Sequence, residues 1–251
     1  MAASQEGLEI RPLESLAEFD RTLDLQKRVW GFDESDLVAP RLFGVFARTG
    51  GSCLGAFLKG ELVGFTLAFA AFKTGGQRYW HSHMAAVEPA LHHRGIGYLL
   101  KLRQREEALA SGLDLIEWTF DPLQARNAYF NIEKLGVSIE GYLPNFYGVT
   151  SSELHGAIPT DRLVAAWHLR SRGVVGRIAG ERPAPSTGER RIEIPARISE
   201  EPRDRAVTIQ DRVRAEFLVA FAAKCRVTHF ERGPDGGAYH LAPELRVPVP
   251  P

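Results

Sequence analysis

The chain has 251 residues, 44% hydrophobic and 10% aromatic, so it can bury a full core as one large domain or as one domain with an extension. Its 31 basic residues balance 31 acidic residues, so the whole protein has no strong electrostatic field that would attract nucleic acid or an anionic membrane. The opening residues lack the pattern of a secretory signal, and the longest apolar segment, LVGFTLAFAAF, is too short to span a bilayer. We therefore expect a cytoplasmic protein with no nucleic-acid or membrane partner, in which any anion site is local.

The two cysteines, Cys53 and Cys225, lie in separate apolar stretches, without CxxC spacing or a His/Cys cluster. This pattern argues against a disulfide framework and against a structural zinc site. Both thiols are expected to pack in the core, and no metal is expected.

The first elements in chain order are a short strand, a helix and a hairpin. LEIRPL alternates like a strand, and the segment 14–31 places apolar side chains near helical spacing before Gly31, which is expected to end the helix. Residues 53–70 predict two strands joined at KGE, where Gly60 can supply a positive φ. Gly64 predicts either a bulge or a close contact.

The central segment predicts a strand, a glycine turn and a helix. RYWHSHMAAV is expected to be a strand ending at Pro89, and the helix after HHRGIG is expected to turn Leu99, Leu102 and Leu109 toward the core. A strand LDLIEWTFD, a helix LQARNAYFNIEKLG ending at Gly136, and a strand VSIEGYL follow. This order is typical of a crossover that builds a mixed sheet.

The last third of the chain changes composition. DRLVAAWHL predicts a strand or a short helix, and the Arg, Gly, Pro and Ser content of 171–190 predicts a linker or mobile loop. Beyond it, RIEIP, a long amphipathic stretch and a hairpin with PDGG at its tip predict a smaller α+β extension. The expected organisation is a main domain over 1–170, a linker over 171–190 and an extension over 191–251.

The glycine turn HHRGIG points to an anion site. A strand that leads directly into a helix start aims several unpaired backbone N–H groups, and the positive end of the helix dipole, at one point. Gly95 and Gly97 remove Cβ atoms that would keep a polyphosphate from the backbone, which predicts a pyrophosphate site. No Lys-Ser or Lys-Thr follows and there is no third glycine, so the turn is neither a Walker A loop nor a dinucleotide fingerprint. The alternative is that the glycines only tighten the turn.

The segment AAVEPALHHRGIGYLL resembles motif A of the GNAT superfamily of acyl-CoA N-acyltransferases, with His92 standing where the family usually has Gln or Arg. The resemblance covers residues 7 to about 150 and implies that 1–170 is an acyl-CoA-binding catalytic domain. It implies an α/β (α+β) fold with a mixed, mostly antiparallel central sheet flanked by helices. It also implies acetyl-CoA or another acyl-CoA as co-substrate and no metal. The implied contacts are the backbone of Ala85, Ala86 and Val87 with the pantetheine arm, and the turn residues His93, Arg94, Gly95, Ile96, Gly97 and Tyr98 with the pyrophosphate.

Two histidines are candidates for proton removal from the attacking amine. His81 and His83 lie two apart on the strand before the turn, so they are expected to share a face, and an imidazole titrates near neutrality. HSHMAAV resembles the His-x-His segment of arylalkylamine N-acetyltransferases, where the pair lines a water route from the amine. The alternative for each histidine is a core residue hydrogen-bonded to backbone.

The donor for the leaving thiolate is less defined by the sequence. Many GNAT enzymes have a Tyr four residues before the glycine that ends the next helix, and Ile132 stands there in this chain. Tyr129, one helical turn earlier, is the catalytic candidate. Asn131 is expected to donate a hydrogen bond to the cofactor. Tyr142, Tyr147 and water are the alternatives.

The strand EWTFDP adds carboxylates. Glu117, Thr119 and Asp121 alternate along it, with Trp118 and Phe120 on the other side. Glu117 is a further catalytic candidate, as a base or as a partner for a cationic amine. Asp121 before Pro122 is equally expected to cap a turn.

The leading hypothesis is transfer of an acetyl or other acyl group from acyl-CoA to a small-molecule or peptide amine by direct attack, without a covalent enzyme intermediate. An alternative is a non-catalytic, regulatory module that binds acyl-CoA, and a third is an acyltransferase that uses another carrier. A homodimer through an exposed sheet edge is one expected state.

Overall fold

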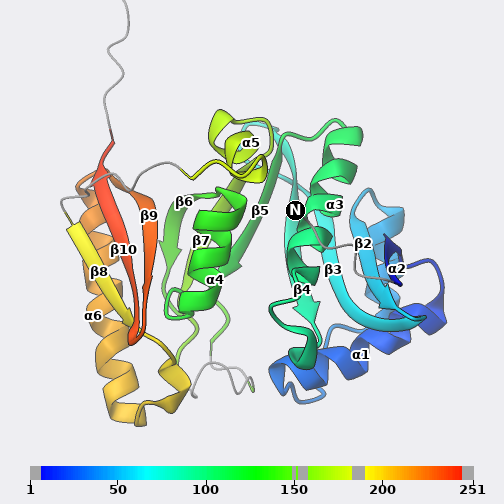
Figure 1. Cartoon of the computed structure of the whole chain (residues 1–251), viewed down its shortest axis with the longest axis horizontal. Coiled ribbons are helices and arrows are strands. Elements are labelled where there is room, and N and C mark those ends of the chain that lie inside the picture. Colours follow the sequence, from blue (N-terminus) through cyan, green and yellow to red (C-terminus); the bar gives the residue numbers. More distant parts are fainter. Residues whose placement is uncertain (1–6, 149–150, 152–157, 183–189, 245–251) are drawn as a thin grey trace, which may run out of the picture. The chain divides into compact units, whose positions relative to one another are not determined.

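The computed structural model describes residues 7–148, 151, 158–182 and 190–244 (Figure 1). The contacts within the chain separate it into two compact units. The first unit contains the described residues up to Trp118, together with Ser151. The second unit contains the other described residues from Thr119 onward. Each unit has its own strands, helices and core.

The first unit is a sheet with helices on both faces. Its strands are hydrogen-bonded in the order β1-β2-β3-β4-β5, antiparallel except for the parallel pair β4 and β5. Its elements are β1 (Leu8–Pro12), α1 (Leu16–Trp30), α2 (Pro40–Arg48), β2 (Ser52–Leu58), β3 (Glu61–Phe72), β4 (Arg78–Val87), a 3₁₀ turn (Pro89–Leu91), α3 (Ile96–Ala110) and β5 (Leu115–Phe120), which continues into the second unit.

Two apolar layers hold the first unit together. Helices α1 and α2 pack on one face of the sheet, where Phe43, Phe65 and Met84 belong to one buried cluster. Helix α3 packs on the opposite face, where Ile96 and Leu100 join side chains of β2 and β3 in a second cluster. The second layer fixes the start of α3, and with it the glycine turn, against the sheet.

The described part of the second unit combines an antiparallel pair of strands, a small three-stranded sheet, four helices and a 3₁₀ turn. Strands β6 and β7 are antiparallel, and the three-stranded sheet has the order β8-β10-β9. The elements are α4 (Ala125–Tyr129), the π-helical η2 (Phe130–Leu135), β6 (Ser138–Leu143), β7 (Arg162–His168), α5 (Arg172–Ile178), β8 (Arg190–Pro195), a 3₁₀ turn (Ile198–Glu200), α6 (Arg203–Ala222), β9 (Cys225–Gly233) and β10 (Gly236–Pro243). The fold prediction, a mixed and mostly antiparallel sheet flanked by helices with a smaller C-terminal α+β part, is confirmed.

Most local predictions are also confirmed. Lys59 and Gly60 both have positive φ in the β2–β3 turn, and Gly31 ends α1 in the left-handed conformation. A Cβ on Gly64 would lie 2.9 Å from the carbonyl oxygen of Ala86, which confirms a close contact. Cys53 is buried, whereas Cys225 is only partly buried, and both are free thiols.

Three expectations need correction. Helix α2 was not predicted, and helix α5 occupies Arg172–Ile178, within the segment expected to be a linker. In α3 the buried positions include Leu100, Lys101 and Gln104, whereas the leucines expected to face the core are only partly buried.

Among the described helices, none has the length and apolarity needed to cross a membrane.

Candidate active site

A β-bulge shapes the strand that carries the two histidines. Met84 pairs with Leu67 and Ser82 pairs with Ala68, so His83 is an extra residue in β4. The rings of His81 and His83 nevertheless lie together against the ring of Phe69, at centroid distances of 5.1 and 6.0 Å. The expectation that both histidines share a face is therefore confirmed, although through a bulge and not through simple alternation.

Burial favours the neutral form of both histidine rings. Burial, followed by the charges of His83 and Lys101, lowers the pKa of His81 to about 4. The ring of His83 reaches solvent, yet the surrounding protein atoms still lower its pKa. A neutral imidazole accepts a proton, so both rings are in the form required to remove one from an amine or from a bridging water.

Glu117 lies beside the histidines in the sheet and is already paired. It pairs with His81 in the register of β4 and β5. Its carboxylate forms an ion pair with Lys73 at 2.6 Å. Glu117 is thus near His81, but it is held by a cation of its own unit.

Strands β4 and β5 diverge just beyond His81. Their pairing consists of Trp80 with Ile116 and His81 with Glu117. From Ser82 to Val87, strand β4 has no pairing with β5 in the part of the chain that the structure describes. This leaves backbone groups of β4, including those of Ala85 and Val87, on an open strand edge that can bind an extended ligand.

The glycine turn presents an uncapped helix start. Gly95 is the N-cap of α3 with φ 77° and offers no side-chain cap, and His93 also has a positive φ. The first-turn amides of Ile96, Gly97 and Tyr98 therefore lack an intrahelical acceptor. The side chain of His92 is directed back to the strand, where its Nε2 donates to the carbonyl oxygen of Val87 at 3.0 Å.

Different structural features explain why each of the two positions in this turn is a glycine. Gly95 needs a positive φ, a conformation that side chains disfavour. Gly97 is helical, and a Cβ there would meet only the Val87 side chain at 3.6 Å, an ordinary contact. Neither the backbone nor the packing requires glycine at position 97, so the space beside it fits a ligand that approaches the backbone, as a pyrophosphate does.

The remaining candidates belong to the second unit. Tyr129, with Lys134, His229 and Arg232, lines an open hollow of about 710 Å³. The Lys134 ammonium and the Arg232 guanidinium lie 5.7 and 5.3 Å from the centroid of the Tyr129 ring. Asn131 is buried in η2, and Ile132, at the position where many GNAT enzymes have Tyr, is also buried.

The other side chains considered from the sequence have structural partners. The Tyr142 hydroxyl donates to buried Asp161 at 2.6 Å, and Asp121 accepts the Leu123 N–H at 2.7 Å as a turn cap. The Thr119 hydroxyl lies 3.2 Å from that of Tyr147. The alternative that Asp121 caps a turn is therefore confirmed, and Tyr142 is a core residue.

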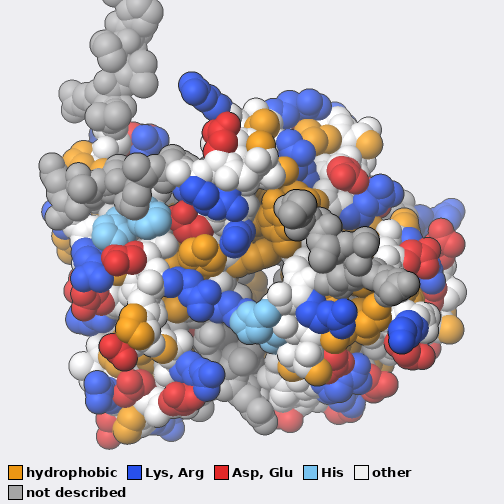
Figure 2. All heavy atoms as spheres, in the orientation of Figure 1, with side chains coloured by type: hydrophobic (Ala, Val, Ile, Leu, Met, Phe, Trp, Pro, Cys, Tyr) orange, Lys and Arg blue, Asp and Glu red, His pale blue; other side chains and the backbone are white. Residues whose placement is uncertain are grey.

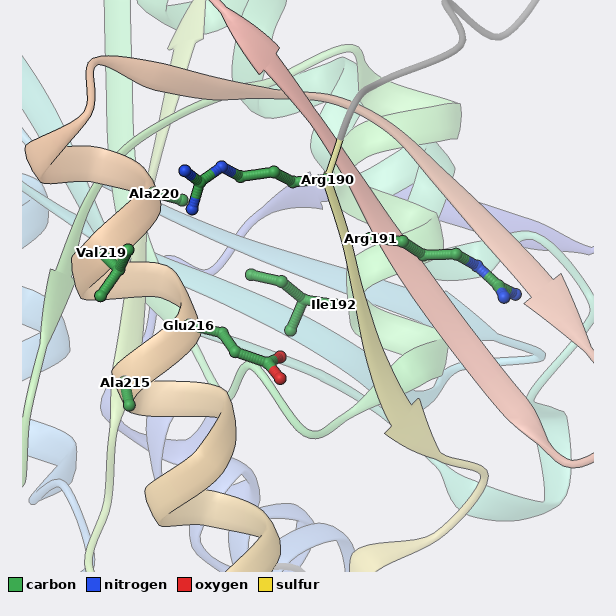
Figure 3. Close-up of a pocket in the computed structure, with 7 residues that line it drawn as sticks. All are labelled: Arg190, Arg191, Ile192, Ala215, Glu216, Val219 and Ala220. Carbon is green, nitrogen blue, oxygen red and sulfur yellow. The ribbon is translucent and has the colours of Figure 1, made fainter.

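A second hollow, of about 400 Å³, lies between β8 and α6 (Figure 3). Arg190 and Ile192 point from β8 toward α6, whereas Arg191 points away (Figure 3). None of the seven lining residues belongs to the predicted site. Basic and acidic side chains are interspersed over the visible face of the protein, in line with its zero net charge (Figure 2).

Sequence reasoning missed two features of the site. Phe69 packs against both histidines and against Phe46 of α2, at a centroid distance of 5.2 Å. Lys101, the second feature, is buried beneath β4. Its Nζ donates to Ser82 Oγ at 2.8 Å. The alternation of β3 could have placed Phe69 on the histidine face, whereas no local signal marks a buried lysine.

Comparison with known proteins identifies the first part of the chain. Residues 18–136 match the model of the acetyltransferase (GNAT) family. No curated protein matches the chain. Among the described residues, no group of three or more His, Cys, Asp or Glu side chains is placed to hold a metal ion.

Solved structures show the same fold at low identity. An acetyltransferase of the GNAT family from Streptococcus pneumoniae is 19% identical over 63% of this chain and 97% of its own, with a TM-score of 0.52. The ribosomal-protein-S18-alanine N-acetyltransferase from Escherichia coli is 15% identical over 66% and 96%, with a TM-score of 0.52. A putative acetyltransferase from Salmonella typhimurium, solved with its cofactor acetyl-CoA, is 15% identical over 67% and 98%, also with a TM-score of 0.52.

Proposed function

Residues 18–136 belong to the acetyltransferase (GNAT) family, and from this premise we propose that the chain transfers an acyl group from acyl-CoA directly to an amine. The acceptor is a small-molecule or peptide amine, and no covalent enzyme intermediate forms. The amine nitrogen forms the new bond to the thioester carbonyl carbon while the bond to sulfur breaks, so the amine loses a proton and the thiolate gains one.

The observation that carries this proposal is the uncapped start of α3. Its first-turn amides have no intrahelical acceptor. Gly97 leaves open space beside them, although neither packing nor backbone conformation requires a glycine at this position. A diphosphate fits such a place because backbone N–H groups and the helix dipole both favour an anion. The open edge of β4 beyond Ser82 is available to an extended arm that leaves the diphosphate.

The residues of β4 supply the proton acceptor in this proposal. Burial lowers the pKa of both His81 and His83, and their rings lie against Phe69, which packs on Phe46 of α2. In the proposed reaction they take the amine proton, directly or through water. Tyr129 is the proposed donor to the thiolate and Asn131 a proposed cofactor contact. Glu117, which is paired with Lys73, is proposed to orient the amine.

A non-catalytic module that binds acyl-CoA is the second candidate. The observation that favours it is Ile132, which is buried where many related enzymes carry a tyrosine. The two candidates differ in turnover. A catalyst releases CoA thiol from acetyl-CoA with some amine in a screen of acceptors, whereas a binding module releases none at saturating acetyl-CoA.

The glycine turn can be tested without knowledge of the acceptor. Gly97→Ala should weaken acetyl-CoA binding about tenfold or more in calorimetry, because its methyl group occupies the space proposed for the diphosphate. The fold should be kept, since alanine favours a helix by up to about 1 kcal/mol over glycine.

Gly173→Ala is the matched control, because Gly173 is also the second residue of a helix and has open space around its Cβ position. It should leave acetyl-CoA affinity unchanged. Equal affinity of the Gly97→Ala variant and the wild type would contradict the proposed diphosphate site. Affinity that does not fall with dephosphorylated CoA analogues would contradict it as well.

A further inference from the structure

Lys101 is buried in the layer between α3 and the sheet, with an exposed fraction of 4%. Its Nζ donates to Ser82 Oγ at 2.8 Å and to Gln104 Oε1 at 3.0 Å. The same nitrogen lies 3.9 Å from the centroid of the Trp118 ring. One ammonium group therefore contacts β4 and β5 from α3.

These contacts lie where the two strands begin to diverge. The last residue pair of β4 and β5 is His81 with Glu117. Ser82 and Trp118 are the next residues of the two strands, and Lys101 contacts both. Ser82 also directly precedes the bulge residue His83.

A lysine is a costly choice for this position. Burial of a charge is unfavourable unless it is paired, and burial lowers the pKa of Lys101 to about 7. Gln104 accepts hydrogen bonds from Lys101 and Ser82, yet its own buried Nε2 has no hydrogen-bond partner. An apolar side chain would fill the layer without these costs, so packing alone does not explain Lys101.

The ammonium group also acts on His81. Burial has the largest effect on the pKa of His81, and the charges of His83 and Lys101 lower it further. Glu117, which pairs with His81 in the register of β4 and β5, forms an ion pair with Lys73. Lys101 therefore contributes a positive charge on the α3 side of the sheet that disfavours the imidazolium form.

We propose that Lys101 is a positioning residue, which fixes the bulge and the divergence of β4 and β5 through Ser82 and Trp118 and places a positive charge on the α3 side of the sheet near His81. The inference rests on the proposed function, because the acyl-CoA arm is proposed to bind where β4 and β5 diverge. The effects of Lys101 on the bulge and on His81 concern the first unit alone, and both can be measured without ligand.

The charge effect is tested by NMR titration of the histidine rings in the acetyl-CoA-free protein. Lys101→Met removes the charge at similar length, and it should raise the pKa of His81 by about half a unit or more. Gln104→Leu is the matched control, since it removes a Lys101 hydrogen bond and leaves the charge, and it should leave His81 within about 0.2 units. Equal His81 titration in wild type and Lys101→Met would overturn this part of the proposal.

The positioning effect is tested by amide hydrogen exchange along β4 in Ser82→Ala, which removes the Lys101 acceptor and no charge. Exchange at His83 and Met84 should accelerate about tenfold, whereas exchange at Phe65 of the neighbouring strand should not change. Unchanged exchange at the bulge would overturn the positioning role, and this variant also gives a result if Lys101→Met does not fold. Failure of the wild type to bind acetyl-CoA would instead contradict the proposed function and leave these two measurements intact.

Discussion

The protonation of Lys101 makes stability depend on pH in the alkaline range. The pKa of a lysine is 10.5 in the unfolded chain and about 7 in this fold, so between these values the unfolded chain binds more protons. The contribution of Lys101 to the free energy of unfolding therefore rises from about pH 7 to about pH 10.5, by at most about 5 kcal/mol. Urea unfolding at several pH values should show this rise in the wild type relative to Lys101→Met. Parallel stability curves for the two proteins would contradict the buried charge.

The residues of the candidate site differ in how far the sequence reveals them. Gly95, Gly97 and the histidine pair were predicted because their spacing has a local physical meaning. Lys101 was not, since its neighbours Ser82 and Trp118 lie 19 and 17 positions away and a lysine on an amphipathic helix ordinarily faces water. Its burial depends on tertiary contacts that no window of sequence contains.

Glu133 joins three elements of the second unit. From η2, its Oε1 accepts the Phe230 N–H of β9 at 3.0 Å and lies 2.8 Å from His229 Nδ1. Its Oε2 forms an ion pair with Arg177 of α5 at 3.0 Å, and both side chains are at least nine-tenths buried. Glu133 thus holds a helix, a π-helical segment and a strand in one arrangement.

Replacement of this carboxylate should be costly. Glu133→Gln leaves the Arg177 guanidinium buried without its counter-charge, and breaking such a pair costs about 3–5 kcal/mol of unfolding free energy. Glu193→Gln is the control, because Glu193 pairs with Arg191 on the surface, and it should cost less than about 1 kcal/mol. Urea unfolding measures both. A similar small loss in the two variants would show that Glu133 does not organise these elements.

Elements with strong local signals were predicted and two short helices were not. The β2–β3 hairpin and the long helices α1, α3 and α6 follow from turn residues and periodic apolar positions. Helix α2 has no side-chain cap and α5 carries glycines at positions 173 and 176, so both depend on packing more than on propensity. A Cβ on Gly176 would meet the Glu181 carboxylate, so this glycine lets the Glu181 side chain lie close to α5 within the second unit.

At the scale of the whole chain, the C-terminal elements share a core with residues far earlier in the sequence. The ring of Phe217 in α6 lies 5.5 Å from that of Tyr142 in β6 and 5.0 Å from that of Tyr239 in β10. The Tyr239 hydroxyl donates to the carbonyl oxygen of Pro122 at 2.7 Å. The composition change at 171–190 suggested a boundary, but contacts across 75 positions (Phe217 with Tyr142) and 117 positions (Tyr239 with Pro122) cannot be inferred from composition.

Asp161 ties α6 to this shared core. Its fully buried carboxylate accepts from Arg214 Nε and Nη2 at 2.8 and 3.0 Å, from the Tyr142 hydroxyl and from the Asn145 N–H. The two-point geometry with a guanidinium is a strong form of ion pair. The pair therefore connects α6 to β6 and to the segment before β7.

Arg214→Met should leave the Asp161 carboxylate buried with only neutral donors, at a cost of about 3–5 kcal/mol in urea unfolding. Arg197→Met removes an exposed pair with Glu200 and should cost less than about 1 kcal/mol. The double variant Asp161→Asn with Arg214→Met should recover part of the loss, because no charge then remains buried. If Arg214→Met costs no more than Arg197→Met, this ion pair does not stabilise the second unit, and the apolar contacts of Phe217 and Tyr239 hold α6 in place without it.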